Sequence, residues 1–195
     1  ALQRMPGWFP LTLAYGCFGF MYLLILGFLT TRLEDDSGWT SVDASVGFSM
    51  LGVAMILGGP MLTTLAQRFG VRRILSVAVG LWPVCTVILL SGITLPVWFA
   101  CVGIGFLFSS LPSLITLYVV ENTTTEDYGA SFAAATLVFG IAQTISPPIG
   151  GWIADTAGSF TLVFLLSAVT SLVGLVATSR LPRTGGLLKA ESDSK

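Results

Sequence analysis

The chain has 195 residues, of which 54% are hydrophobic and 10% charged, and its formal net charge is −1. A soluble domain cannot bury that much apolar surface, so the composition indicates an integral membrane protein. The sequence contains no histidine, which excludes histidine-based catalysis, histidine metal sites and histidine pH switches. It also lacks a basic patch interleaved with aromatic residues, so we expect no nucleic-acid partner.

Cys17, Cys85 and Cys101 fall inside apolar segments and show no CxxC spacing. We interpret them as small core residues rather than as metal ligands or disulfide partners. The sequence offers no buried acid pair and no phosphate-cradling loop, so we expect neither an enzyme nor a cofactor. It begins Ala-Leu-Gln without a Met, and we expect a fragment or a processed product.

Six apolar stretches of about twenty residues are long enough to cross a membrane as helices. They lack the alternation of barrel strands, so the predicted fold class is an all-α membrane protein. The spans are predicted at about residues 9–29, 44–66, 74–90, 97–120, 129–154 and 160–179. Residues 1–8 are a short lead-in and residues 180–195 a polar tail, and the short connections leave no room for a soluble domain.

In the first span, Tyr15, Gly19 and Tyr22 lie three or four residues apart and therefore share one helix face. Residues 30–43, which follow this span, are predicted to form a polar loop. The prolines at Pro83 and in the fourth span are expected to kink their helices, as happens both around cavities and in static bundles.

The second span ends in the sequence AQRFGVRR, residues 66–73. Gly70 permits a tight turn between two antiparallel helices. Arg68, Arg72 and Arg73 suit anchoring of this turn at anionic lipid, near a helix C-terminus that favours cations. A plain membrane anchor and a functional turn are both compatible with this pattern.

Nearly all Lys and Arg residues fall on one side of the predicted spans, the side that also holds both termini. Only Arg32 falls on the other side, next to three acidic residues. The positive-inside rule therefore places both termini in the cytoplasm. We expect a multi-pass protein of the plasma (inner) membrane, with the lipid bilayer as its surroundings.

Residues 139–160, FGIAQTISPPIGGWIADTAGSF, form the most informative stretch. Pro147 and Pro148 remove two backbone donors and are expected to bend or break the helix. Gly150 and Gly151 allow another helix to approach closely. Polar groups at membrane depth need a partner or a water-filled cavity, and here they come from Gln143, Thr144 and Ser146. Asp155 then marks the exit, where it either serves a function or caps the turn before the last span.

This stretch resembles the eleventh helix of major facilitator transporters, although Ser146-Pro147-Pro148 stands where the family usually has Gly-Pro. The turn at residues 68–73 is similar to the family's loop after the second helix of each half, with Gln67 in place of an acid. The first span, LAYGxxGFxY, adds to a likeness with a bacterial branch. The resemblance covers nearly the whole chain and implies the C-terminal six-helix half of such a transporter, built as two inverted three-helix repeats.

The resemblance also implies roles for particular residues. In the family, the basic turn and a charge at a neighbouring helix end lock the inward gate, and Glu121 is our candidate for that charge. The first, fourth and fifth spans would line the solute cavity. The gating candidates are Arg68, Gly70, Arg72, Arg73, Glu121, Pro147, Pro148, Gly150, Gly151 and Asp155. The substrate-binding candidates are Tyr15, Phe18, Tyr22, Phe106, Ser109, Ser110, Ser113, Thr136, Phe139, Gln143 and Thr144.

Aromatic faces with a few hydroxyls and one amide suit a small, weakly polar or neutral organic solute. No acidic or basic residue lies deep inside a span, so the sequence offers no proton relay. The expected partner is an N-terminal six-helix half or a second copy of the chain. A non-transporting six-helix scaffold or a channel-like oligomer is the alternative.

Overall fold

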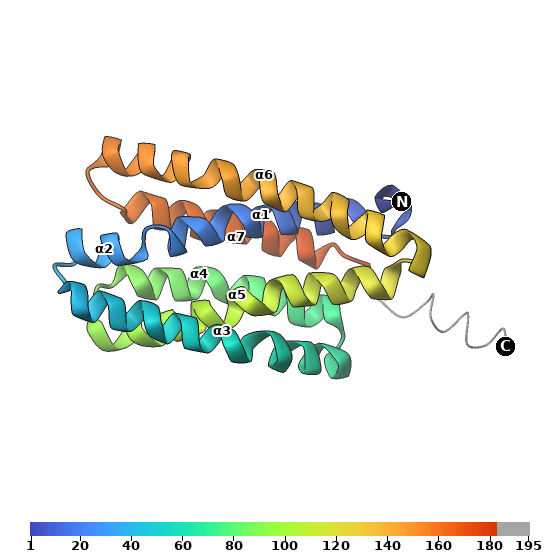
Figure 1. Cartoon of the computed structure of the whole chain (residues 1–195), viewed down its shortest axis with the longest axis horizontal. Coiled ribbons are helices and arrows are strands. Elements are labelled where there is room, and N and C mark those ends of the chain that lie inside the picture. The colour runs from blue at the N-terminus through green and yellow to red at the C-terminus, as the bar shows by residue number, and fades with distance from the viewer. Residues whose placement is uncertain (183–195) are drawn as a thin grey trace.

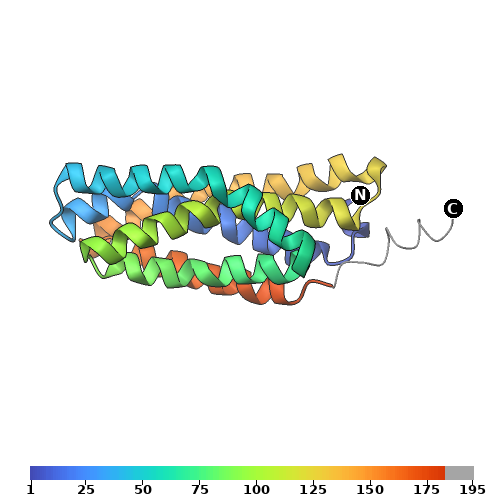
Figure 2. The same cartoon turned by 90° about the horizontal axis from the view of Figure 1, so that it is seen from below.

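The computed structural model describes residues 1–182, where every regular element is a helix (Figure 1, Figure 2). Six of the helices are long and apolar enough to cross a membrane, which confirms the predicted fold class. The elements are a short 3-10 helix η1 (Leu2–Arg4), α1 (Trp8–Leu26), α2 (Leu29–Asp35), α3 (Ser41–Phe69), α4 (Val71–Leu90), α5 (Thr94–Asn122), α6 (Thr125–Ala157) and α7 (Thr161–Ser179). All α-helices except α2 are candidate spans, and most of the predicted tail, residues 183–195, lies outside the described residues.

Three of the spans, α3, α5 and α6, extend beyond their predicted stretches at both ends. Polar caps explain the early starts of α3 and α6. The side chain of Thr40 accepts a hydrogen bond from the backbone N–H of Asp43 at 3.1 Å. The side chain of Thr124 accepts one from the N–H of Asp127 at 3.3 Å. Because these caps satisfy N–H groups that have no partner within the helix, the helices begin before the apolar residues do.

The helix contacts show a two-fold repeat, which relates the triplet α1, α3 and α4 to the triplet α5, α6 and α7. α1 packs against α6 and α7, α5 packs against α3 and α4, and α4 packs against α7. Exchanging α1, α3 and α4 with α5, α6 and α7 turns each of these contacts into another contact of the same set. This symmetry is the one that two three-helix repeats require, and it matches half of a transporter fold.

The prediction of a polar loop over residues 30–43 is wrong at its start, where α2 forms. Leu29 and Leu33 lie one turn apart and are fully buried on the face of α2 that meets the bundle. Arg32 is also buried, at 4% exposure. The segment is polar in composition but amphipathic in arrangement, and this arrangement allows a helix.

Arg32 joins α2 to the end of α4. Its guanidinium donates to the carbonyl oxygens of Leu89 at 3.1 Å and of Leu90 at 3.0 Å, and it lies 5.4 Å from the ring centroid of Phe164. These carbonyls belong to the last turn of α4, where no helical N–H reaches them. Burial lowers the pKa of the Arg32 guanidinium, and the charge of Asp36 partly opposes this change.

The prolines do not break their helices. α6 is helical through Pro147 and Pro148, so a break there is absent, and α4 is also helical through Pro83. A proline leaves the carbonyl four residues earlier without its usual donor. The Ser171 hydroxyl of α7 donates to one such carbonyl, that of Val79, at 2.7 Å. In α6 the Ser146 hydroxyl lies 3.4 Å from the Gln143 carbonyl oxygen that Pro147 leaves free.

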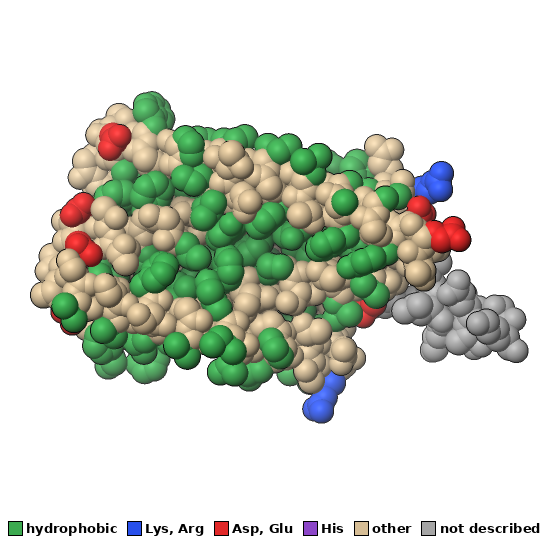
Figure 3. All heavy atoms as spheres, in the orientation of Figure 1, with side chains coloured by type: hydrophobic (Ala, Val, Ile, Leu, Met, Phe, Trp, Pro, Cys, Tyr) green, Lys and Arg blue, Asp and Glu red, His purple; other side chains and the backbone are tan. Residues whose placement is uncertain are grey.

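Charged side chains lie at the two ends of the bundle and apolar side chains cover the surface between them (Figure 3). The end that holds α2 shows acidic side chains, whereas the end that holds the N-terminus shows both arginine and acidic side chains. Large apolar side chains are widely exposed on this middle surface, for example Val53 at 64% and Ile56 at 72%. The chain is therefore an integral multi-pass membrane protein.

Candidate functional site

An aromatic cluster joins α1 to α6 near the middle of the bundle. The ring centroid of Phe139 in α6 lies 4.6 Å from that of Tyr15, 5.7 Å from that of Phe18 and 5.7 Å from that of Tyr22. Gly19 makes this approach possible, because an added Cβ atom would come within 2.5 Å of the Phe139 carbonyl oxygen. The predicted face of the first span therefore meets the predicted face of the fifth span.

The cluster includes a fifth ring that the sequence did not indicate. Phe108 of α5 lies 5.1 Å from Tyr22 and 5.9 Å from Phe18, measured between ring centroids. The sequence could not show which face of α5 meets α1, because apolar residues occupy most of that helix. We define the aromatic cluster as Tyr15, Phe18, Tyr22, Phe108 and Phe139.

One hydrogen bond gives this cluster a polar end. The Tyr22 hydroxyl donates to Oε1 of Gln143 in α6 at 2.6 Å. The Gln143 amide nitrogen has no hydrogen-bond partner within residues 1–182, and it lies beside a groove of about 570 Å³ along α6. Thr136 and Thr144 line the same groove. The Thr144 hydroxyl is bonded to the Gly140 carbonyl at 2.8 Å, whereas the Thr136 hydroxyl has no partner in the described part of the chain.

The other predicted substrate contacts lie apart from the cluster, between α5 and α3. The Ser109 hydroxyl accepts a hydrogen bond from the Gly59 N–H at 3.1 Å. Ser110 is fully buried and donates to the Phe106 carbonyl at 2.6 Å, and Ser113 donates to the Ser109 carbonyl at 3.0 Å. These hydroxyls serve helix packing in this conformation. Phe106 lines a separate apolar groove of about 450 Å³, against residues of α3.

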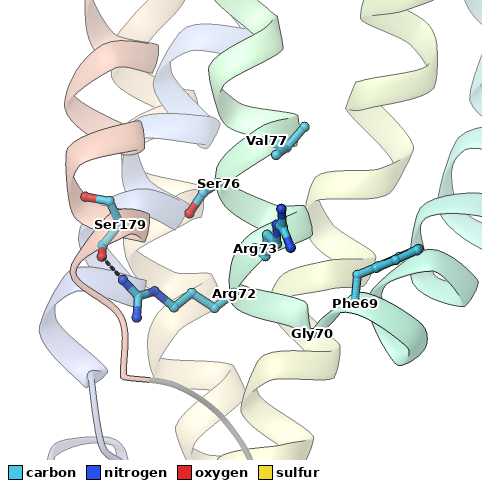
Figure 4. Close-up of a pocket in the computed structure, with 7 residues that line it drawn as sticks. All are labelled: Phe69, Gly70, Arg72, Arg73, Ser76, Val77 and Ser179. Carbon is cyan, nitrogen blue, oxygen red and sulfur yellow. Dashed lines mark hydrogen bonds between the residues drawn. The ribbon is translucent and has the colours of Figure 1, made fainter.

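The basic turn lies at the end of the bundle that holds the N-terminus (Figure 1), and Figure 4 shows four of its residues. Gly70 joins α3 to α4 with φ of +91°, a backbone angle that suits glycine. Arg72 donates to the backbone carbonyl of Ser179 at the end of α7, while Arg68 and Arg73 are exposed. The Tyr118 hydroxyl of α5 lies within electrostatic reach of both Arg72 and Glu121. The hydrogen bond that this hydroxyl makes is to the Pro6 carbonyl, at 3.3 Å.

The remaining gating candidates follow the second half of α6. Gly150 is buried against the end of α1 and the start of α2, since an added Cβ atom would come within 2.7 Å of the Phe28 ring and 2.9 Å of Leu24. Gly151 has no neighbouring atom within 4 Å of an added Cβ. Asp155 is exposed.

The interpretation of Asp155 as a cap is wrong. The start of α7 is instead capped from α2's side, by an Asp36 carboxylate oxygen that lies 2.8 Å from the Phe160 backbone nitrogen and 2.9 Å from the Ser159 hydroxyl. No sequence pattern indicates this cap, because the Asp36 carboxylate lies 124 positions before Phe160, whose backbone N–H donates to it. Within residues 1–182, no group of three or more Cys, Asp or Glu residues is placed to hold a metal ion.

Six membrane-crossing helices in two exchangeable triplets define a multi-pass, all-helical membrane protein with the layout of half a transporter fold. The family model of the Major Facilitator Superfamily matches residues 11–194 of the chain, so the chain belongs to that family. It is similar to Monocarboxylate transporter 12 of Rattus norvegicus, with 29% identity over 80% of this chain and 32% of the relative. It is also similar to Protein ZINC INDUCED FACILITATOR-LIKE 1 of Arabidopsis thaliana, with 26% identity over 86% of this chain and 37% of the relative.

A probable peptide/nitrate transporter of Arabidopsis thaliana is 28% identical over 78% of this chain and 31% of the relative. The chain thus spans about a third of the length of the curated relatives that it matches. Two of these three relatives are transporters by name and the third is named after a facilitator, so the names of the relatives point to transport.

Proposed function

We propose that this chain is one half of an alternating-access transporter for a small organic solute. An N-terminal six-helix half or a second copy of the chain would enclose the pathway with it. The distribution of arginines supports cytoplasmic termini in a plasma (inner) membrane. Tyr22, Phe108, Phe139 and Gln143, which are half-buried, would line the pathway, whereas Tyr15 and Phe18 are buried in this conformation. The basic turn with Glu121 would close the cytoplasmic side.

The observation that carries the proposal is the bond between Tyr22 and Gln143. An amide in the middle of a span is costly against lipid, because lipid tails offer no hydrogen bonds. Here the amide oxygen is satisfied and its nitrogen lies beside an open groove. This arrangement suits a helix face that meets water, a solute or another protein surface rather than lipid.

The same bond indicates the chemistry of the solute. Since Tyr22 donates to the amide oxygen, the group that Gln143 has left to offer is an N–H donor. A donor beside aromatic rings suits an apolar body with a carbonyl or carboxylate oxygen. Because some relatives are named as monocarboxylate transporters, we place short monocarboxylates such as lactate first among the solutes to test.

Solute protection of an engineered cysteine tests this proposal. Cys17, Cys85 and Cys101 are replaced by alanine, Gln143→Cys is introduced, and labelling by a thiol reagent is followed in membranes with and without lactate. We expect lactate to slow the labelling severalfold. The panel is extended to pyruvate, nitrate and a dipeptide if lactate gives no protection.

Val173→Cys in α7 is the matched control. It is 47% exposed and lies about as many residues from the α6–α7 turn as Gln143, so it sits at a similar depth. Its labelling should not respond to solute. Labelling at position 143 that no solute on the panel changes, in a membrane that also shows no uptake, would favour the scaffold alternative.

A further inference from the structure

A second cavity lies at the N-terminal end of α4, far from the aromatic cluster. It has a volume of about 660 Å³ and lies between the first turns of α4 and the end of α7 (Figure 4). The residues that line it are Phe69, Gly70, Arg72, Arg73, Ser76, Val77 and Ser179. Two of these seven carry a positive charge, and none carries a negative charge.

The polar groups of this cavity are only partly used by the protein. Arg72 is held in place by its bond to the Ser179 carbonyl, which leaves its other N–H groups available. Arg73 and Ser76 make no hydrogen bond within residues 1–182. The Ser76 hydroxyl differs in this respect from Thr64 in the preceding helix, whose hydroxyl donates to the carbonyl one turn back at 2.8 Å. The cavity therefore contains hydrogen-bond donors that have no acceptor in the described part of the chain.

The backbone adds to the positive field. Gly70 provides no side-chain cap for α4, so the first N–H groups of this helix have neither a helical acceptor nor a capping side chain. The start of a helix carries a partial positive charge in addition. Two guanidinium groups, a hydroxyl and a helix start are together the chemistry that binds a phosphate group.

The apolar residues of the cavity indicate where the phosphate comes from. Phe69 is 57% exposed and Val77 is 51% exposed, and both belong to membrane-crossing helices. A soluble anion would gain nothing from these exposed apolar side chains, whereas the acyl chains of a lipid would pack against them. We propose that this cavity binds the phosphate headgroup of an anionic phospholipid, with Arg72, Arg73 and Ser76 as the donors that can turn toward the phosphate and Phe69 and Val77 beside the chains.

Lipid binding to the whole chain tests this site. The protein is purified in detergent, and single-lipid adducts with phosphatidylglycerol and phosphatidylcholine are measured by native mass spectrometry. We expect phosphatidylglycerol to bind more tightly than phosphatidylcholine. Arg73→Gln should weaken this binding about tenfold, because it removes a charge-assisted pair, and Ser76→Ala should weaken it to a smaller extent.

Arg68→Gln is the matched control, because it removes an exposed arginine from the same turn that does not line the cavity. It should leave the affinity for phosphatidylglycerol nearly unchanged. Equal losses in Arg68→Gln and Arg73→Gln would overturn the site in favour of general surface charge. Displacement of the lipid by millimolar inorganic phosphate would overturn the lipid as the ligand and leave a site for a soluble anion. The side chains of Arg68 and Arg73 make no hydrogen bond within residues 1–182, so both variants should fold.

Discussion

Tyr22 contributes to the proposed site by fixing the orientation of a neighbouring amide. Tyr22→Phe keeps the ring in the aromatic cluster and removes the hydroxyl that donates to Gln143. The freed amide can then present either its oxygen or its nitrogen to a solute. We expect the KM for an acceptor solute to rise roughly fivefold, which corresponds to about 1 kcal/mol. Uptake kinetics in proteoliposomes measure this change.

Tyr128→Phe is the control for this prediction. Tyr128 stacks on Phe132, with 5.9 Å between ring centroids, and its hydroxyl has no hydrogen bond in the described residues. Its removal should leave KM unchanged. An equal rise in both variants would show that the effect comes from loosening of α6 and not from the amide.

At the level of single residues, the sequence predicted the shared face of α1 correctly, whereas the solute contacts expected from α5 and α6 stay predictions. Spacing alone placed Tyr15 and Tyr22 on one face, and both meet Phe139. The hydroxyls of α5 were expected on the same site, yet Ser110 bonds to its own helix and is buried. A serine in an apolar helix can satisfy itself on the preceding turn, so its presence says little about its partners.

Among the helices, the contact between α3 and α5 depends on two glycines, Gly58 in α3 and Gly105 in α5. A Cβ atom added to Gly105 would collide with the Leu51 carbonyl oxygen of α3, which is backbone and cannot rotate away. We expect Gly105→Ala to destabilise the protein by about 1–3 kcal/mol. Gly52→Ala in α3 is the matched control, since nothing lies within 4 Å of its added Cβ. In thermal unfolding in detergent, the midpoint temperature should be lower for Gly105→Ala and unchanged for Gly52→Ala. Equal midpoints in the two variants would contradict this packing.

The bond between Ser171 and the Val79 carbonyl explains how α4 accommodates Pro83. Ser171→Ala removes the donor and leaves a buried carbonyl without a partner, at a cost of about 1–3 kcal/mol. In a Pro83→Ala background the new N–H can donate to the same carbonyl. The serine substitution should then cost about 1 kcal/mol less, and a double-mutant cycle from chemical unfolding measures this coupling.

Thr170→Ala provides the comparison for that cycle. The Thr170 hydroxyl bonds within α7, to the Leu166 carbonyl at 2.8 Å, so it should show no coupling to Pro83. Additive costs for Ser171 and Pro83 would contradict the compensation. The sequence indicated the prolines but not their compensation, because the compensating hydroxyl of Ser171 lies on another helix, 92 positions from its acceptor.

For the whole molecule, hydropathy was sufficient to predict six spans, because each span had to be apolar to cross lipid. Hydropathy could not predict the hydrogen bonds at the end of the bundle that holds α2. There Arg32 caps α4, Asp36 caps α7, and the Trp39 indole donates to the Gly92 carbonyl at 2.9 Å. These bonds join segments that are distant in sequence, and only the fold brings them together. They hold this end of the six helices as one unit, as a half that moves as a rigid body requires.

The opposite end of the molecule is where the proposed gate would act. Arg72 and Glu121 both lie within electrostatic reach of the Tyr118 hydroxyl, so the acid contributes to the field around the basic turn. Glu121→Gln removes that charge, and we expect it to shift the transporter toward the conformation open on this side. In the cysteine-free background, Thr136→Cys should then be labelled severalfold faster by an impermeant reagent added to the cytoplasmic face.

Glu126→Gln is the control for the gate, because Glu126 is an exposed acid in the first turn of α6 at the same end of the molecule. A rise in labelling with Glu121→Gln alone ties the gate to the charge beside the basic turn. The same rise in both variants would attribute it to the net charge of this end, since long-range effects of exposed acids are similar and are screened by salt. Unchanged labelling in Glu121→Gln would remove this residue from the gate, and the basic turn would then act as a lipid anchor.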